Sequence, residues 1–175
     1  MSARILVVDD IESNVRLLEA KLSAEYYEVL TAQDGPTALA LAAAELPDIV
    51  LLDVMMPGMD GFDVCRRLKD DPLTRHIPVV LVTALDGRAD RVAGLEAGAD
   101  DFLTKPIDDV MLFARVRSLT RLKGVIDELR DREASGRRMG VIAGAASRLG
   151  GSGGRILIVD DNVRQAERVA AELAV

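Results

Sequence analysis

Five short apolar runs, each followed by a segment of helical length, constrain this sequence most strongly. The runs occupy residues 5–8, 28–31, 49–53, 79–83 and 101–104. Three of them, all but the second and the last, are apolar at nearly every position, which is typical of strands that helices cover on both faces. Strands that alternate with helices form βαβ units. The sequence therefore predicts an α/β fold, a doubly wound five-stranded parallel sheet.

The segments between the runs carry signals for the start and end of helices. Val15, Leu18 and Leu22 recur at helical spacing. Asp34 and Asp60 are suited to cap the second and third helices, because aspartate accepts hydrogen bonds from free backbone N–H groups. These signals predict one helix after each strand.

The last helix should begin near Asp108 and outlast the turns that cover a sheet. Its apolar positions step by three or four residues from Leu112 to Leu129. An extended C-terminal helix with such a seam favours self-association or docking on a neighbouring domain, and a homodimer is the expected outcome. A simple amphipathic linker is equally compatible with the pattern.

Charge and hydropathy limit the classes of partner. Residues 1–120 carry 12 basic and 21 acidic side chains, a net charge of −9. Nucleic acid is therefore not an expected partner, since binding it depends on neutralising phosphates. The apolar runs are far shorter than the roughly 20 residues of a membrane helix. The single cysteine, Cys65, allows no internal disulfide, and we expect a cytoplasmic protein without membrane contact.

Polar side chains gather where four of the five strands end. They are Asp9 and Asp10 after the first, Asp53 at the end of the third, Thr83 at the end of the fourth and Lys105 after the fifth. Each residue is ordinary by itself, as a turn former, a strand former or a solvated charge. In an open parallel sheet, however, ligands bind beyond the carboxyl ends of the strands. The joint placement therefore predicts a site at that edge.

Three neighbouring carboxylates repel one another unless a cation lies between them. Mg2+ suits the set, because it binds through one or two carboxylates and keeps water and phosphate oxygens. Lys105 would supply a positive charge for an anion. The sequence contains no GxxxxGK[ST] and no GxGxxG cradle for a nucleotide. We therefore expect a phosphoryl-handling pocket in which Asp53, as nucleophile, forms an aspartyl phosphate.

These residues also carry a resemblance to a known family. The sequence reads DD at 9–10, LLDVMMPGMDG at 51–61, TA at 83–84 and KP at 105–106. With these motifs, the chain from residue 4 to about 121 resembles the response-regulator receiver domain. The resemblance implies a flavodoxin-like sheet with strand order 2-1-3-4-5.

The resemblance also implies roles for individual residues. Asp53 would be the phosphoacceptor, and a histidine kinase or a phosphotransfer protein would supply the phosphoryl group. Asp9 and Asp10 would hold Mg2+, which Mn2+ could replace, together with Asp53 and the backbone carbonyl of Met55. Lys105 would bind the phosphoryl group.

Four further residues have expected roles through the same resemblance. Thr83 would be the switch hydroxyl, and Ala84 would be small enough to leave the phosphoryl group access. Pro106 would follow a cis peptide bond. Phe102 occupies the position of an aromatic switch, although a core phenylalanine without that role is equally compatible.

The start of the sequence is repeated near its end. RILVVDD at 4–10 recurs as RILIVDD at 155–161, an internal repeat. We expect a receiver domain at 1–121, a helical extension and Gly-rich linker at 122–154, and the first strand and helix of a second receiver at 155–175. This layout resembles PleD-type regulators, in which two receivers precede a GGDEF diguanylate cyclase domain. The sequence contains no GGDEF motif, so this chain should not make cyclic di-GMP.

Two other functions remain compatible with the residues. A degenerate receiver could serve only as an interaction platform. A phosphatase of the haloacid dehalogenase type also forms an aspartyl phosphate, but that family places its nucleophile in a DxD motif after the first strand. As an enzyme, the chain is expected only to phosphorylate itself from phosphodonors and to dephosphorylate itself.

Overall fold

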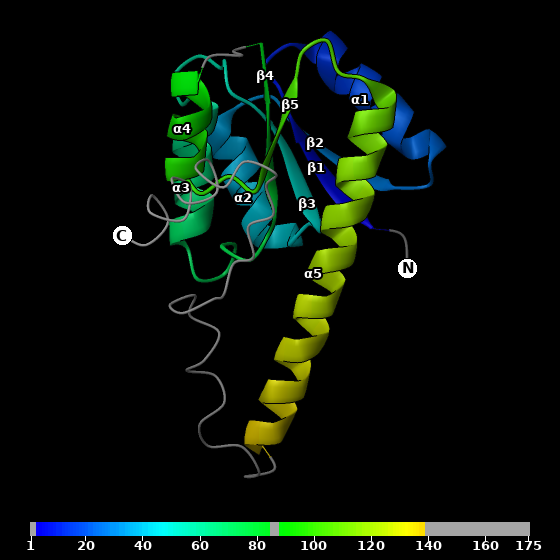
Figure 1. Cartoon of the computed structure of the whole chain (residues 1–175), viewed down its shortest axis with the longest axis vertical. Coiled ribbons are helices and arrows are strands. Elements are labelled where there is room, and N and C mark those ends of the chain that lie inside the picture. The colour runs from blue at the N-terminus through cyan, green and yellow to red at the C-terminus, as the bar shows by residue number, and fades with distance from the viewer. Residues whose placement is uncertain (1–2, 85–87, 139–175) are drawn as a thin grey trace, which may run out of the picture. The chain divides into compact units, whose positions relative to one another are not determined.

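The computed structural model of the chain describes residues 3–84 and 88–138. Strands and helices alternate along the described chain (Figure 1). The strands are β1 (Arg4–Val8), β2 (Glu28–Ala32), β3 (Ile49–Asp53), β4 (Val79–Thr83) and β5 (Asp101–Thr104). The helices are α1 (Glu12–Ala24), α2 (Gly35–Glu45), α3 (Gly61–Asp70), α4 (Arg88–Glu96) and α5 (Asp109–Arg138).

The five strands form one parallel sheet in the order β2-β1-β3-β4-β5. The predicted α/β fold and the strand order 2-1-3-4-5 are therefore confirmed. From β1 the chain adds β2 on one side of the sheet and then β3, β4 and β5 on the other. The winding direction therefore reverses between β1 and β3, whose carboxyl ends are adjacent. This is the position at which open parallel sheets bind ligands.

Alternate side chains of the strands enter two separate cores. Leu6 and Val8 of β1 pack in a core with buried residues of α2 and α3. Ile5 and Val7 pack on the other face, in a core that includes Leu18 of α1. Because successive strand residues point to opposite faces, each central strand is buried on both sides. The continuous apolar runs in the sequence follow from this arrangement.

Aspartate side chains cap the amino ends of three helices, α2, α3 and α5. The Asp60 carboxylate accepts a hydrogen bond from the backbone N–H of Asp63 at 2.8 Å, and Asp34 accepts one from Thr37 at 2.8 Å. Both predicted caps are confirmed. The last helix begins at Asp109 rather than Asp108, since the Asp108 carboxylate accepts the N–H of Met111 at 2.9 Å and so acts as its cap.

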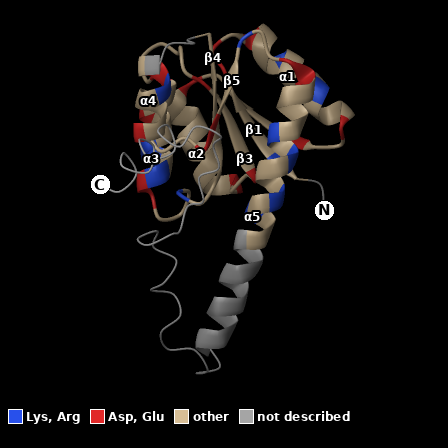
Figure 2. Cartoon of the chain, viewed as in Figure 1, with Lys and Arg blue, Asp and Glu red and all other residues tan. Residues whose placement is uncertain are grey.

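The predicted extension of the last helix is also confirmed, because α5 continues through Arg138. Leu112 and Val116 are fully buried against the sheet, whereas Leu122 and Val125 are 53% and 52% exposed. Lys and Arg recur along the same helix (Figure 2). The expected linker beyond residue 138 and the second receiver start at 155–175 lie outside the described residues. Among the described helices, none is both long enough and apolar enough to span a membrane.

Candidate functional site

The carboxyl ends of β1, β3, β4 and β5 bring together most of the polar residues singled out in the sequence. Asp9 and Asp10 follow the last residue of β1, and Asp53 is the last residue of β3. Asp53 is paired in register with Val82, which places Thr83 at the next position along β4. The backbone N–H of Lys105 donates to the carbonyl of Thr83 at 2.8 Å. The loop after β5 is thereby fixed beside the end of β4.

Lys105 joins the two most buried carboxylates of the site. Its Nζ lies 2.9 Å from Oδ2 of Asp9 and 3.1 Å from Oδ1 of Asp53. Asp9 is 2% exposed and Asp53 is 3% exposed. The peptide bond between Lys105 and Pro106 is cis, as the family resemblance implied. Residues from three strand ends therefore meet in one buried charged cluster.

Three carboxylates at this site are close enough to share one cation. Asp9, Asp10 and Asp53 each offer an oxygen within 4.8 Å of the other two. Oδ1 of Asp10 is buried and accepts no hydrogen bond from any described residue. Buried polar atoms normally have a partner, and a carboxylate oxygen is the ligand that Mg2+ prefers. The donor set therefore fits a magnesium ion, with Asp10 offering an oxygen that has no other partner.

The electrostatic environment of Asp53 opposes its ionisation. Burial raises the pKa of its carboxyl above the usual value, and the negative charge of Asp9 acts in the same direction. The hydrogen bond and the charge of Lys105 lower that pKa, but they do not offset the burial. A cation beside Asp53 would stabilise its ionised form, which is the form that can act as a nucleophile.

The electrostatic environment of Lys105, in contrast, favours its charged form. Burial lowers the pKa of its ammonium group, but the hydrogen bonds from Lys105 to Asp9 and Asp53, with the charges of both, outweigh burial and raise it. Lys105 therefore remains charged at neutral pH. One fixed positive charge thus faces three carboxylates, and the cluster keeps an excess of negative charge.

The rim of the site is open beside the buried cluster. Met55 is 61% exposed, and Ala84 is exposed, whereas Thr83 is 5% exposed. Gly61, the first residue of α3, lies close to the backbone at the end of β3. A Cβ added to Gly61 would lie 2.3 Å from the carbonyl oxygen of Asp53. Glycine is therefore required where α3 begins, a role that the sequence analysis did not assign.

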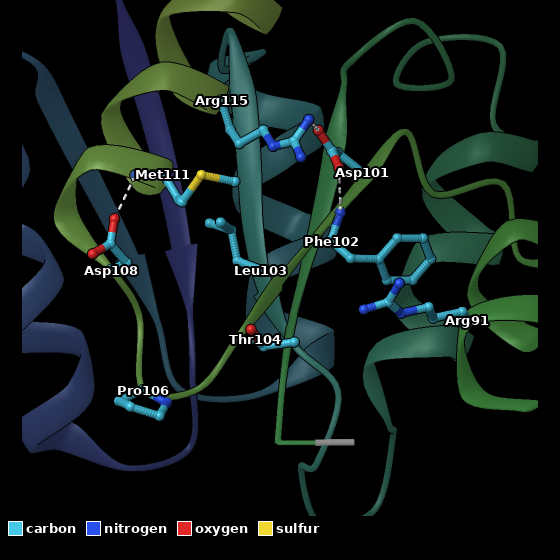
Figure 3. A pocket seen from close by; sticks show the side chains of 9 residues that line it. All are labelled: Arg91, Asp101, Phe102, Leu103, Thr104, Pro106, Asp108, Met111 and Arg115. Atoms are coloured by element: carbon cyan, nitrogen blue, oxygen red, sulfur yellow. Dashed lines mark hydrogen bonds and ion pairs between the residues drawn. The ribbon is translucent and has the colours of Figure 1, made fainter. Parts of the chain in front are cut away.

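Phe102 lies away from the cluster, on the side of β5 that faces α4 (Figure 3). Its ring contacts the position of Gly94, where an added Cβ would lie 2.5 Å from Cε1 of the ring. Arg91 points toward the same ring in Figure 3. The ring is half-buried in a pocket between α4, β5 and α5. This placement leaves both expectations for Phe102 open, a switch or a core side chain.

Asn14 is a site residue that the sequence analysis missed. Its side-chain amide donates to both carboxylate oxygens of Asp9, at 3.0 Å each. Asn14 lies in the first turn of α1, five residues after Asp9. The available signal was a polar amide one helical turn after the acidic pair, at the start of the segment in which Val15, Leu18 and Leu22 recur at helical spacing.

Comparison with known proteins identifies relatives of the chain. Residues 5–117 match the response regulator receiver domain. The chain is 85% identical over 175 residues to the response regulator PleD of Caulobacter vibrioides, and all of it aligns. It spans only 38% of the length of that relative.

Solved structures give the same fold. The signal receiver domain of a signal transduction histidine kinase from Syntrophus aciditrophicus is 39% identical, with a TM-score of 0.65 over 69% of this chain and 91% of that one. The receiver domain of a sensor histidine kinase from Pseudomonas aeruginosa is 31% identical, with a TM-score of 0.63 over 71% of this chain and 99% of that one. In the latter structure a magnesium ion is coordinated in the active-site cleft.

Proposed function

Because the chain belongs to the response regulator receiver family, we propose that it accepts a phosphoryl group on Asp53 with the help of Mg2+. One observation carries this assignment to Asp53. Lys105 bridges the buried carboxylates of Asp9 and Asp53 while a neighbouring oxygen of Asp10 has no partner among the described residues. The arrangement combines a nucleophile, a cation site and a fixed positive charge.

Asp10, Asp53, Asp9 and the carbonyl of Met55 are the groups that would hold the metal. Mg2+ would neutralise charge on the transferred group, and Mn2+ is an expected substitute. A carboxylate oxygen of Asp53 attacks phosphorus, so that an O–P bond forms as the P–N bond of a phosphohistidine breaks. Lys105 then stabilises the phosphoryl oxygens on Asp53.

We assign the donor and the response on the same premise. Receiver domains take the phosphoryl group from histidine kinases or phosphotransfer proteins, and we propose such a partner here. Exposed Ala84 would leave the incoming group room. Thr83, at the end of β4, would respond to the phosphoryl group as the switch hydroxyl, and Phe102 would follow it.

The domain organisation is also a proposal. A receiver at 1–121 would be followed by a helical extension at 122–154 and the start of a second receiver at 155–175. The half-exposed Leu122 and Val125 on α5 support dimerisation through the extension. The high identity to PleD supports a longer parent protein in which this receiver regulates a GGDEF diguanylate cyclase domain.

The matched family favours a receiver over a dehalogenase-type phosphatase. The complete set of Asp9, Asp10, Asp53, Thr83 and Lys105 argues against a degenerate platform.

Intact mass spectrometry tests the proposal. Incubation with Mg2+ and acetyl phosphate should add one phosphoryl group to the wild type and none to Asp53→Asn. Asp34→Asn is the matched control, because it changes an exposed helix cap and should leave the adduct intact. An unmodified wild type would contradict the proposal, and an adduct on Asp53→Asn would move the acceptor to another residue.

A further inference from the structure

We propose that Asn14 is a positioning residue for the metal site, which holds the carboxylate of Asp9 in the orientation that the site requires. This inference rests on the proposed function, because it concerns the affinity of the same carboxylates for Mg2+. Asn14 is assigned no contact with the metal or with the phosphoryl group.

The hydrogen bonds of Asp9 support the assignment. Oδ1 accepts from the backbone N–H of Ile11 at 2.9 Å and from Nδ2 of Asn14 at 3.0 Å. Oδ2 accepts from Nζ of Lys105 at 2.9 Å and again from Nδ2 of Asn14 at 3.0 Å. Of these three donors, Asn14 alone reaches both oxygens. It therefore restrains rotation of the carboxylate about its terminal bond.

The neighbouring aspartate has the opposite environment. Oδ1 of Asp10 accepts no hydrogen bond from any described residue, whereas each oxygen of Asp9 accepts two. Asp9 is therefore a ligand with a fixed orientation, and Asp10 is a ligand whose Oδ1 has no partner among the described residues. Asn14 maintains this difference between two adjacent carboxylates.

The place of Asn14 in the fold suits this role. It lies on a helix, and its own backbone N–H donates to the carbonyl of Ile11 at 2.9 Å. Helix α1 begins after Ile11 without a side-chain cap, and the Asp9 carboxylate accepts the N–H of Ile11 itself, directly before the helix. A rigid element thus holds the supporting amide, which is how precise sites are built.

The chemistry of the amide also fits a cation site. An amide donates a hydrogen bond to Asp9 without adding charge. A lysine or arginine in its place would repel a divalent ion, and an aspartate would add a fourth carboxylate. Groups that orient metal ligands typically contribute about 10- to 100-fold to metal affinity.

Isothermal titration of Mg2+ into the full chain tests the inference. Asn14→Leu keeps a side chain of similar size without the amide, and Asn14→Ala removes the side chain. Both should raise the dissociation constant for Mg2+ about tenfold or more. Ser13→Ala is the matched control, because Ser13 is an exposed neighbour on α1 and should leave Mg2+ affinity unchanged.

Thermal unfolding without Mg2+ separates positioning from a purely structural role. A lower melting temperature with an unchanged dissociation constant in both Asn14 variants would overturn the inference. If Asn14→Leu fails to fold, Asn14→Ala decides the outcome by the same criterion. A wild type that binds no Mg2+ would overturn the proposed function together with this inference, whereas a binding wild type with unaffected variants would overturn this inference alone.

Discussion

The two ends of the sheet hold charged side chains in contrasting ways. At the carboxyl end, three carboxylates face one lysine, and one carboxylate oxygen has no partner among the described residues. At the amino end, Asp48 and Asp100 each pair with a lysine. Asp48 accepts the backbone N–H of Arg4 at 2.7 Å and Nζ of Lys123 at 3.1 Å.

Asp100, the residue before β5, lies beside the first residue of β4. One carboxylate oxygen of Asp100 accepts Nζ of Lys69 at 2.7 Å and the backbone N–H of Val79 at 2.8 Å. In both pairs the lysine is more buried than its acid, and the pairing gives the lysine ammonium an acceptor, which favours the folded state. The cluster at the carboxyl end carries an excess of negative charge, which opposes folding when no cation is bound. An excess of like charge thus distinguishes the functional end from the structural end.

The largest effect should come from neutralising Asp10, whose Oδ1 accepts no hydrogen bond within the described part of the chain. Asp10→Asn should weaken Mg2+ binding by more than about tenfold, since it neutralises one of the three carboxylates proposed to hold the ion. Without Mg2+, the same change should leave the melting temperature unchanged or raise it, because one of three repelling charges is lost. Calorimetric titration and thermal unfolding measure the two effects. A loss of stability in metal-free buffer would break the contrast between the ends.

The sequence anticipated the elements and the cluster better than the individual contacts. Apolar runs and helical periodicity placed every strand, and the strand ends located Asp9, Asp53 and Lys105. The contact of Lys123 with Asp48 could not be predicted, because these residues are 75 positions apart and meet only through the way α5 packs on the sheet. Periodicity shows which face of a helix is buried, but not which polar atoms meet there.

At the amino end, removing an acid should have the opposite effect on stability. Asp48→Ala leaves the buried Lys123 ammonium and the N–H of Arg4 without this partner. The free energy of unfolding should fall by about 2 kcal/mol, discounted because Asp48 is partly exposed. Chemical denaturation measures the change, and Mg2+ affinity should remain that of the wild type.

A double variant sharpens this result. Lys123→Met removes the positive charge that pairs with Asp48. In the background of Lys123→Met, Asp48→Ala should cost measurably less than in the wild type, because the two residues interact. If the two substitutions change the free energy of unfolding additively, Asp48 and Lys123 do not stabilise each other, and the contrast between the two ends of the sheet fails.

The smallest effect concerns the direction of two titrations. Burial raises the pKa of Asp53 above 3.8. The Asp34 carboxylate accepts a hydrogen bond from Thr37, which lowers the pKa of Asp34 below 3.8. In metal-free buffer, Asp53 therefore contributes stability below pH 3.8, and the contribution is lost as pH rises through its folded-state pKa. Asp34 contributes stability above pH 3.8, and the contribution is lost as pH falls through its folded-state pKa.

Carboxyl carbon chemical shifts followed against pH measure both groups. Asp53 should titrate above Asp34. Protons compete with Mg2+ for Asp53, so added Mg2+ should lower the apparent midpoint of Asp53 and leave that of Asp34 unchanged. A midpoint for Asp53 below that of Asp34 in metal-free buffer would contradict the electrostatic difference between the site and an exposed helix cap.

Chemical mapping of the phosphorylated residue tests the central claim most directly. Borohydride reduces an aspartyl phosphate to homoserine, which peptide mass spectrometry locates in the sequence. After incubation with acetyl phosphate and Mg2+, homoserine should be found at position 53 and should be absent when Mg2+ is chelated. Homoserine at any other aspartate, or at position 53 in equal yield without Mg2+, would contradict the account of the carboxyl end as a metal-dependent phosphoryl site.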